Sequence, residues 1–399
     1  MEAYMVFSNI DTYMKDAQEA AVQAIELRRQ IHRHPETGNH EEKTSALVEE
    51  TLRALGLEVS RPMGTSVVAT LRGAQEGKTV AFRADMDALP VQEETDLPFK
   101  SEVPGVMHAC GHDIHTAGLL GAAMVLAKHR DELKGNVKFF FQPDEEDSGG
   151  AQRMIQAGCM ENPRVDAVFG AHVDPDLPTG HVGFKYGKSY AASDMFIVTI
   201  RGKGCHGASP HDGIDVIAIG AQVITAIQQI VSRRTSPTES AVVTVGAFNA
   251  GTAGNVIAQE ATLRGILRTL GPEMRMKTRR MFTDTVEGIC SAMGAQAEVK
   301  IIESYPGVVN WDDMVDLAKN VAEDAVGRDR IHIFDQPTMG TEDFGYFIKD
   351  VPGAYYKIGV GNPDIGAVHP IHSPHFVADE AALPTLIGVH AAIAAAYLQ

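Results

Sequence analysis

The chain has 399 residues, more than one typical hydrophobic core contains, so two domains are expected. Its formal net charge is −17 at pH 7, which argues against nucleic acid or an anionic membrane as a partner because both require clustered basic side chains. The four cysteines form no CxxC pair and predict neither a disulfide framework nor a zinc ribbon. With no hydrophobic signal segment and no apolar run long enough to span a bilayer, we expect a cytoplasmic protein.

Helix and strand patterns alternate through the first half of the chain. Hydrophobic periodicity predicts helices over 11–33, 41–55, 113–130 and 148–158. Apolar runs predict strands over 66–71, 79–82, 136–142 and 165–171. Such alternation favours an α/β fold with a mixed, largely parallel sheet flanked by helices.

The pattern changes near residues 186–189. Strands are predicted over 194–201, 241–248, 255–270 and 297–303, and helices over 214–233 and 272–293. This β-α-β-β-α-β order is that of a ferredoxin-like α+β domain. We therefore expect residues 188–304 to form an inserted domain. Residues 1–187 and 305–399 would form the larger one, which resumes with helices over 311–326 and 380–398 and a strand over 355–358.

Side chains that bind metals follow several predicted strands of the larger domain. They are Asp85, Asp87, Glu145, Glu146 and His172, and two further candidates, Cys110 and His112, lie two residues apart in a turn rich in small residues. The carboxyl ends of parallel strands meet at one edge of a sheet, so these groups are expected close together. Thiolate, imidazole and carboxylate together suit zinc, manganese or another transition metal. Asp85 and Asp87 face the same side of a strand, so both could reach the site or support its ligands.

Each of these signals also has a structural explanation. Cys110 could be an ordinary buried cysteine, a lone His172 at a strand end is often structural, and an acidic loop is often merely solvated. The buried strand before Glu145 and Glu146 favours the metal site, because it anchors that loop in the interior. Adjacent carboxylates point in different directions, so one can bind metal while the other acts as a general base.

The motifs resemble one family along nearly the whole chain. The stretches are RADMDALP (83–90), MHACGHDIHTA (107–117), FQPDEEDSGGA (141–151), GAHVDPDLPTG (170–180), GKGCHGASPH (202–211), GTAGNVIAQEATLRGILRT (251–269), MGTEDFGYF (339–347) and IHSPHF (371–376). They resemble the dinuclear-metal amidohydrolases that include hippurate hydrolase, N-acyl-amino-acid amidohydrolases and auxin–amino acid conjugate hydrolases. More distantly, they are similar to aminoacylase and the glutamate-releasing carboxypeptidases.

This resemblance implies a zinc-exopeptidase-like catalytic domain with an inserted lid and dimerisation domain. It implies a metal-dependent amidohydrolase that cleaves the amide bond of N-acyl amino acids to a carboxylic acid and a free amino acid. Two divalent metal ions per subunit are expected, manganese or zinc first, with cobalt or nickel as alternatives. The expected assembly is a homodimer or a dimer of dimers.

The resemblance also assigns roles to individual residues. The metal ligands fall on Cys110, His112, Glu146, His172 and His372. Glu145 matches the general base. His206 matches a residue that reaches into the partner subunit's site and stabilises the oxyanion, and Asn255 and Arg268 match positions that hold the substrate carboxylate.

Three residues depart from the family pattern, namely Asp144, Cys205 and Ala258. Asp144 replaces a small residue, and its charge is expected to raise the pKa of Glu145 by like-charge repulsion. Two alternatives stay open. One is a dipeptidase or carboxypeptidase on the same dinuclear site, and the other is a non-catalytic protein that binds acyl amino acids.

Overall fold

The computed structural model describes residues 9–399, and the chain divides into two compact units. The first unit runs from residue 9 to Gly187 and includes Val309–Gln336 and Asp343–Gln399. The second comprises Lys188–Val308 and Pro337–Glu342. The short segment 337–342 groups with the second unit because two backbone contacts hold it there. Tyr190 forms an isolated β-bridge with Thr338, and the Ala191 amide donates to the Gly340 carbonyl at 3.0 Å.

An eight-stranded sheet forms the centre of the first unit, in the order β1-β2-β4-β3-β5-β16-β6-β15. β4, β3, β5 and β16 run parallel, whereas β2 and β6 pair antiparallel to β4 and β16. The strands are β1 (Glu58–Ser60), β2 (Val67–Arg72), β3 (Gln75–Asp85), β4 (Lys134–Gln142), β5 (Ala167–Pro178), β6 (Val182–Phe184), β15 (Ile331–Ile333) and β16 (Gly353–Gly361).

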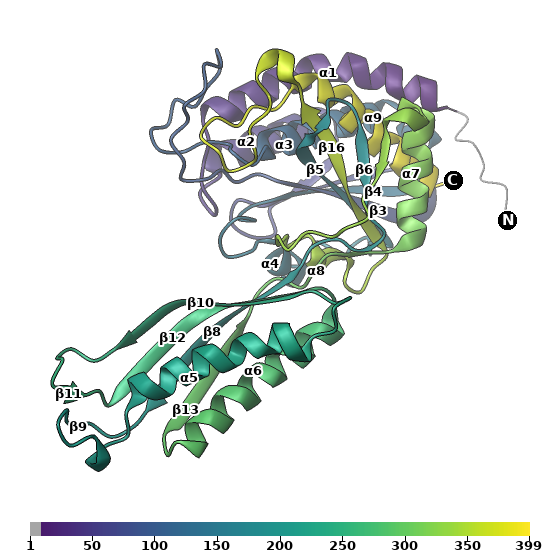
Figure 1. Cartoon of the computed structure of the whole chain (residues 1–399). Helices are drawn as coiled ribbons and strands as arrows, with labels where there is room; N and C mark the ends of the chain where they lie inside the picture. The colour runs from purple at the N-terminus through teal and green to yellow at the C-terminus, as the bar shows by residue number, and fades with distance from the viewer. Residues whose placement is uncertain (1–8) are drawn as a thin grey trace. The chain divides into compact units, whose positions relative to one another are not determined.

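Helices flank this sheet. They are α1 (Ile10–Arg33), α2 (Glu42–Ala54), α3 (His112–Lys128), α4 (Ala151–Gln156), α7 (Asp312–Val326), α8 (Gly345–Ile348) and α9 (Leu383–Tyr397). Figure 1 shows α1 and α9 on one side of the sheet and the short α4 and α8 on the other. α3 packs closely on α9, because two glycines of α3 leave room for side chains of α9. A Cβ at Gly118 would lie 2.3 Å from Leu386, and a Cβ at Gly121 would lie 2.4 Å from Ile387.

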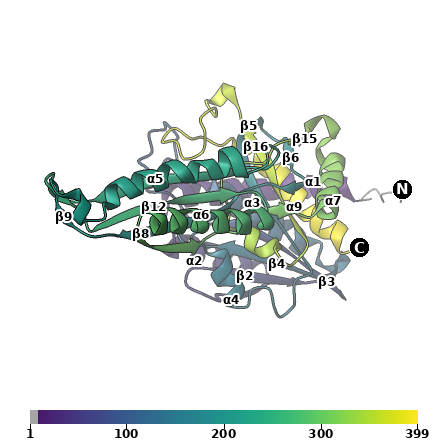
Figure 2. The ribbon, with the colours of Figure 1, turned by 60° about the horizontal axis from the view of Figure 1, so that its bottom comes forward.

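The second unit has an antiparallel sheet in the order β10-β12-β8-β13. Two helices, α5 and α6, lie along this sheet (Figure 2). Its elements are β8 (Ala192–Arg201), α5 (Val216–Gln229), β10 (Ala241–Ala250), β12 (Glu260–Thr269), α6 (Pro272–Ala292) and β13 (Gln296–Glu303). Phe196, Val223 and Phe282 belong to its buried core. Two short ladders pair β9 (Cys205–His206) with β11 (Val256–Ile257), and β7 (Gly187–Lys188) with β14 (Val309–Asn310).

Several predicted boundaries differ from the structure. The strand predicted over 255–270 is broken, because β11 pairs with β9 whereas β12 pairs with β8 and β10. β5 continues to Pro178, so His172 lies within this strand and not at its end. The three-residue strands β6 and β15 were not predicted, since such short segments carry no readable periodicity.

Among residues 9–399, two helical stretches are long and apolar enough to cross a membrane, Val216–Arg234 and Glu380–Tyr397. This criterion uses only length and composition, and the core helix of a soluble protein also meets it. Glu380–Tyr397 is mostly buried inside the first unit. Val216–Arg234 is α5 with one π-helical turn added, and α5 packs on the sheet of the second unit.

Candidate metal centre

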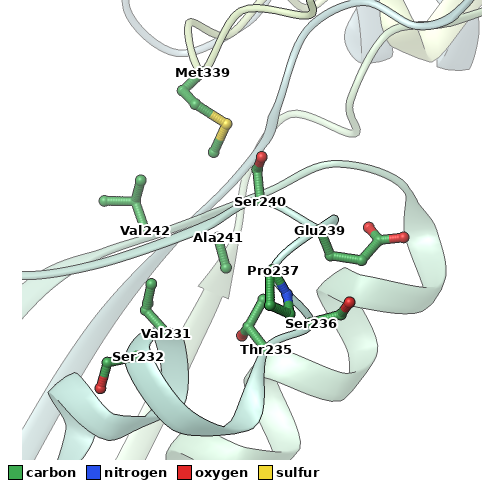
Figure 3. Close-up of a pocket in the computed structure, with 10 residues that line it drawn as sticks. All are labelled: Val231, Ser232, Thr235, Ser236, Pro237, Glu239, Ser240, Ala241, Val242 and Met339. Atoms are coloured by element: carbon green, nitrogen blue, oxygen red, sulfur yellow. The ribbon is translucent and has the colours of Figure 1, made fainter.

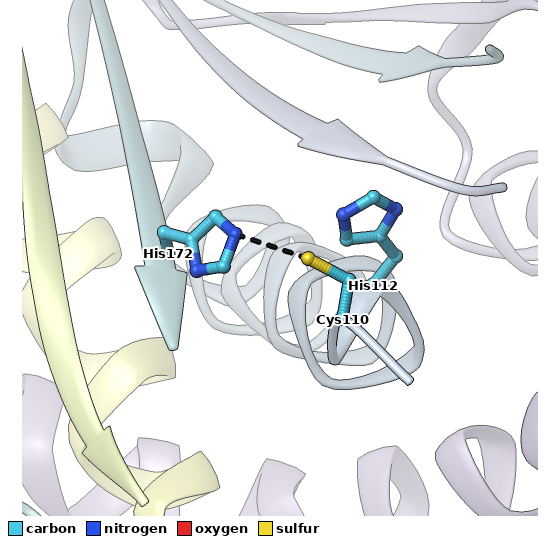
Figure 4. Close-up of side chains that lie close together, drawn as sticks. All are labelled: Cys110, His112 and His172. Atoms are coloured by element: carbon cyan, nitrogen blue, oxygen red, sulfur yellow. Dashed lines mark hydrogen bonds between the residues drawn. The ribbon is translucent and has the colours of Figure 1, made fainter. Parts of the chain in front are cut away.

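Gly111, whose backbone is in the left-handed conformation, lets Cys110 and His112 lie together at the start of α3. Gly111 has φ 84°, and a Cβ there would lie 2.5 Å from a methyl group of Val173 on β5. Only glycine fits this turn without strain. Figure 4 shows the result, with the His172 ring facing the Cys110 sulfur and the His112 ring beside it. The His172 Nε2 lies 3.4 Å from the Cys110 Sγ.

His112 and His172 are oriented by the same type of hydrogen bond. The Nδ1 of His112 lies 2.9 Å from the Asp87 carbonyl oxygen, and the Nδ1 of His172 lies 2.7 Å from that of Val173. A carbonyl only accepts, so each Nδ1 carries the proton and donates it. Each Nε2 is thereby turned toward the cluster, the arrangement common in histidines that bind metals.

Glu146 and His372 complete the cluster. The His372 Nε2 lies 3.1 Å from the Glu146 Oε1, and the Nε2 of His112 lies 3.9 Å from the same oxygen. The His372 backbone is left-handed, with φ 65°, and its amide donates to the Ala109 carbonyl. The Glu146 amide donates to the Asp87 carboxylate at 3.0 Å, which fixes the start of this side chain.

The predicted ligands form overlapping groups whose donor atoms lie within 4.8 Å of one another. These groups are Cys110 with His112 and His172, Cys110 with Glu146 and His372, and His112 with Glu145 and Glu146. The structure therefore brings together all five predicted ligands, and Glu145 lies among them.

The electrostatics of the cluster favour a bound cation. Burial raises the pKa of the Cys110 thiol well above its usual value, so a nearby cation is needed to ionise it. Burial opposes the charged form of His112, but the Asp85 carboxylate overcomes this and holds the pKa of His112 well above its usual value. A metal ion bound at the His112 Nε2 would supply the positive charge that the Asp85 carboxylate stabilises.

Within residues 9–399, two buried atoms at the cluster make no hydrogen bond. They are the Nε2 of His112 and the Oε1 of Glu146, the latter despite its 3.1 Å approach to the His372 Nε2. An unpartnered buried polar atom is costly, so each needs an explanation. One thiol, three imidazoles and a carboxylate form a donor set that transition metals bind. The residues present therefore fit metal ions.

A second network lies beside the cluster. The Nδ1 of His115 lies 2.6 Å from the Asp85 carboxylate, and its Nε2 accepts from the Val173 amide at 2.9 Å. Arg83 forms an ion pair with Asp85 and donates to Asp343 at 2.8 Å. His115, Arg83 and Asp343 were not predicted as site residues. His115 lies one helical turn after His112, and that spacing is the only signal that pointed to it.

His206, Asn255 and Arg268 lie in the second unit. The exposed His206 is on β9, and its Nδ1 accepts from the Ala208 amide at 3.0 Å, so its Nε2 carries a proton that can be donated. Asn255 is exposed and stands before β11, where its carbonyl accepts from Gly207. Arg268 is half-buried on β12.

The second unit also contains a pocket of about 440 Å³ (Figure 3). It is lined by Val231, Ser232, Thr235, Ser236, Pro237, Glu239, Ser240, Ala241, Val242 and Met339. Its single carboxylate, Glu239, is paired with Lys188 at 3.1 Å. None of the predicted site residues lines this pocket.

The three departures from the family pattern have clear places in the structure. Asp144 forms an ion pair with Arg153, so the extra negative charge beside Glu145 is compensated. The Cys205 thiol donates to the Ser209 carbonyl at 3.3 Å. Ala258 is buried in the core of the second unit.

Residues 81–396 match the family described as peptidase family M20/M25/M40. The N-acyl-L-amino acid amidohydrolase of Geobacillus stearothermophilus is 48% identical over 74% of this chain and 80% of its own length. Thermostable carboxypeptidase 1 of Saccharolobus solfataricus is 40% identical over 96% of this chain and 98% of its own. The solved structure of the Bacillus subtilis YXEP protein, described as a dinuclear metal binding peptidase, is 35% identical, with a TM-score of 0.83 over 96% of this chain and 99% of that one.

This chain belongs to the M20/M25/M40 peptidase family. The family resemblance predicted from the motifs is confirmed. The predicted fold class, a mixed and largely parallel sheet flanked by helices, is confirmed as well.

Proposed function

We propose that this chain is a metal-dependent amidohydrolase that cleaves N-acyl amino acids to a carboxylic acid and a free amino acid. The family and the relatives named for this reaction support the enzyme class expected from the sequence. The observation that carries the proposal is the pair His112 and His172, each held through Nδ1 so that Nε2 faces the cluster, with Glu145 beside them.

Cys110, His112, Glu146, His172 and His372 would hold two divalent metal ions, manganese or zinc first, with cobalt or nickel as alternatives. Bound there, such ions supply Lewis acidity that activates water and polarises the amide carbonyl. Burial and the nearby Lys357 lower the pKa of His172 well below its usual value, so this imidazole stays neutral and suited to ligation.

Glu145 acts as the general base and then as the general acid. It accepts a proton from the attacking water and delivers it to the nitrogen of the departing amine. Its buried position excludes bulk water from this transfer. Asp87 orients His112 through its backbone carbonyl, and Asp85 holds His115 beside the cluster.

The second unit would act as lid and dimerisation domain in a homodimer or a dimer of dimers. The Nε2–H group of His206 in one subunit donates a hydrogen bond to the oxyanion in the site of the other subunit. Asn255 and Arg268 hold the substrate carboxylate. The substrate is a small molecule, and the protein works in a reducing cytoplasm, which agrees with four unpaired cysteines.

A carboxypeptidase activity on the same centre is the second candidate. It is favoured by the similarity to thermostable carboxypeptidase 1 along nearly the full length of both chains. The chemistry at Glu145 is the same for both substrates, because each contains an amide bond next to an amino acid carboxylate. Substrate choice therefore has to be measured.

The first experiment combines metal reconstitution with a substrate screen. The protein is stripped with a chelator and reloaded with manganese, zinc, cobalt or nickel, and bound metal is counted. Amine release is then followed from N-acetyl, N-benzoyl and indole-acetyl amino acids and from dipeptides. Metal-dependent release from acyl amino acids is expected. Release from dipeptides alone would favour the carboxypeptidase, and two bound ions without any turnover would favour a binding protein.

A complementation experiment tests whether His206 acts in the partner subunit. His206→Ala and Glu145→Ala homodimers are each expected to be inactive. Mixing equal amounts and allowing subunit exchange should restore about a quarter of the wild-type activity, because half of the dimers are mixed and each carries one complete site. No recovery, in a mixture shown by mass spectrometry to contain mixed dimers, would mean that His206 does not act across the interface.

A further inference from the structure

A buried carboxylate precedes the two glutamates of the site. Asp144 is fully buried, and its backbone is left-handed with φ 58°. Among residues other than glycine, aspartate and asparagine tolerate this conformation best. Glu145 and Glu146 follow directly, so the backbone turn at residue 144 sets the direction in which both side chains leave the end of β4.

The Asp144 carboxylate binds partners from two separate segments. It accepts a hydrogen bond from the Asn39 side chain at 2.7 Å and forms an ion pair with Arg153 of α4. The Ser148 amide donates to it at 3.3 Å, which closes the loop after the glutamates back on its beginning. The charge of this buried group is thus matched by a cation and its oxygens are hydrogen-bonded.

The segment between α1 and α2 is shaped around this carboxylate. A Cβ at Gly38 would lie 2.4 Å from the Asp144 Oδ1, so the aspartate occupies the space that a side chain there would need. The buried Glu41 accepts from the Asp144 backbone amide at 2.9 Å. The same segment is fixed to the end of the sheet, because the Ala88 amide donates to the Glu36 carbonyl at 2.8 Å.

Arg153 connects both ends of the loop. Besides its ion pair with Asp144, it donates to the Gly149 carbonyl at 3.0 Å and to the Asn39 side chain at 2.9 Å. Removing either Asp144 or Arg153 would therefore break the ion pair between them, and each change would also release contacts of its own with Asn39.

We propose that Asp144 is a positioning residue for the hydrolysis, and that its carboxylate, held by Arg153 and Asn39, fixes the turn that directs Glu145 at the metal cluster. The proposal rests on the proposed function, in which Glu145 transfers the proton. It concerns a feature of this chain, because the family that the sequence resembles usually has a small residue at this position.

The test compares Asp144→Ala with Asp144→Asn in metal-loaded enzyme. Asp144→Ala should lower kcat about tenfold or more, since a misplaced catalytic group loses rate steeply, with KM changed by less than about twofold and two ions still bound. Asp144→Asn should stay within about threefold of wild type, because asparagine keeps an acceptor and tolerates the left-handed backbone. Asp147→Ala, which removes an exposed carboxylate from the same loop, is the matched control and should not change kcat.

A double-mutant cycle separates positioning from general loss of structure. Arg153→Ala should lower kcat as Asp144→Ala does, and the double variant should lose less than the product of the two single losses, because both changes break the same ion pair. Losses that multiply would overturn the proposal. A kcat loss that follows loss of bound metal would overturn it too, since Asp144 would then serve metal retention.

The variant Glu145→Gln distinguishes a failure of the proposed function from a failure of the positioning role of Asp144. If it turns over substrate at the wild-type rate, the base assignment and the positioning role both fail. If it is inactive while Asp144→Ala keeps the wild-type kcat, the proposed function stands and the positioning role alone is wrong. Should Asp144→Ala fail to fold, Asp144→Asn and Arg153→Ala still decide between these outcomes.

Discussion

The cluster around Cys110 and the network around Arg83 lie side by side in the first unit and use the same kinds of side chain. His115 belongs to the network, and its ring centroid lies 4.8 Å from that of His172 and 5.4 Å from that of His112. Both ring nitrogens of His115 are used, one on Asp85 and one on the Val173 amide. His112 and His172 each use one nitrogen on a carbonyl and turn the other into the cluster.

This difference separates a structural histidine from a candidate ligand more clearly than burial or composition does. All three rings are buried, and Asp85, His112 and His115 also have donor atoms within the range of a metal site. A ligand, however, needs a nitrogen that no protein group already occupies. The hydrogen bonds therefore favour the proposal that metals would bind on the side of Cys110, with His115 in the network.

The largest effect is expected from Glu145→Gln. The amide cannot accept a proton, so kcat should fall by about a thousandfold, within the range ascribed to general acid–base catalysis. Both metal ions should remain bound, because the five ligands are untouched. The measurement is kcat together with metal content. Loss of an ion would show that Glu145 is a ligand and that the roles of the two adjacent glutamates are exchanged.

A matched pair of histidine variants tests the comparison directly. His172→Asn should lower the metal content from two ions to about one, because a metal site with one ligand fewer holds its ion weakly. His115→Asn should keep two ions and lose stability, since its contacts are with Asp85 and Val173. Metal is counted after reloading and buffer exchange. Equal metal loss in both variants would place His115 among the ligands.

The candidate ligands could be predicted because they stand in short motifs that resemble one family. The Cys-Gly-His turn and the adjacent glutamates are visible in a few residues, and the parallel strands that carry them show as apolar runs. Their orientation could not be predicted, since the Nδ1 of His112 is held by a carbonyl 25 residues away. The partner of Asp144 was missed for the same reason, because nothing in the loop sequence pairs it with Arg153.

A further network shows how far such pairings extend along the chain. Arg28 of α1 donates to Asp113 of α3 at 2.6 Å, a contact between residues 85 positions apart. The Nδ1 of His32 lies 2.8 Å from the same carboxylate, and its Nε2 lies 3.3 Å from Glu93. Asp113 immediately follows His112, so this ion-pair network supports the helix start that carries the ligand.

The titration of this network gives the smallest of the expected effects. Burial opposes the charged form of His32, but Asp113 and Glu93 outweigh it and hold the pKa of His32 above its usual value. The stabilisation is therefore fully present below the unfolded pKa of about 6.5 and is lost as the pH rises through the folded pKa. Burial likewise favours neutral Asp113, yet Arg28 and His32 keep its pKa well below the usual value, so its contribution is lost only in acid.

His32→Gln should consequently cost more stability at pH 5.5 than at pH 8.5. A charged hydrogen-bonded group contributes about 1.5–3 kcal/mol, so a cost of about this size is expected at the lower pH and a smaller one at the higher. Urea unfolding of the variant and of the wild type at each pH measures the difference, with metal content matched. His34→Gln, which changes a half-buried histidine just past the end of α1, is the matched control. An equal cost of His32→Gln at both values would mean that His32 is neutral in the folded protein, and that Arg28 alone balances the charge of Asp113.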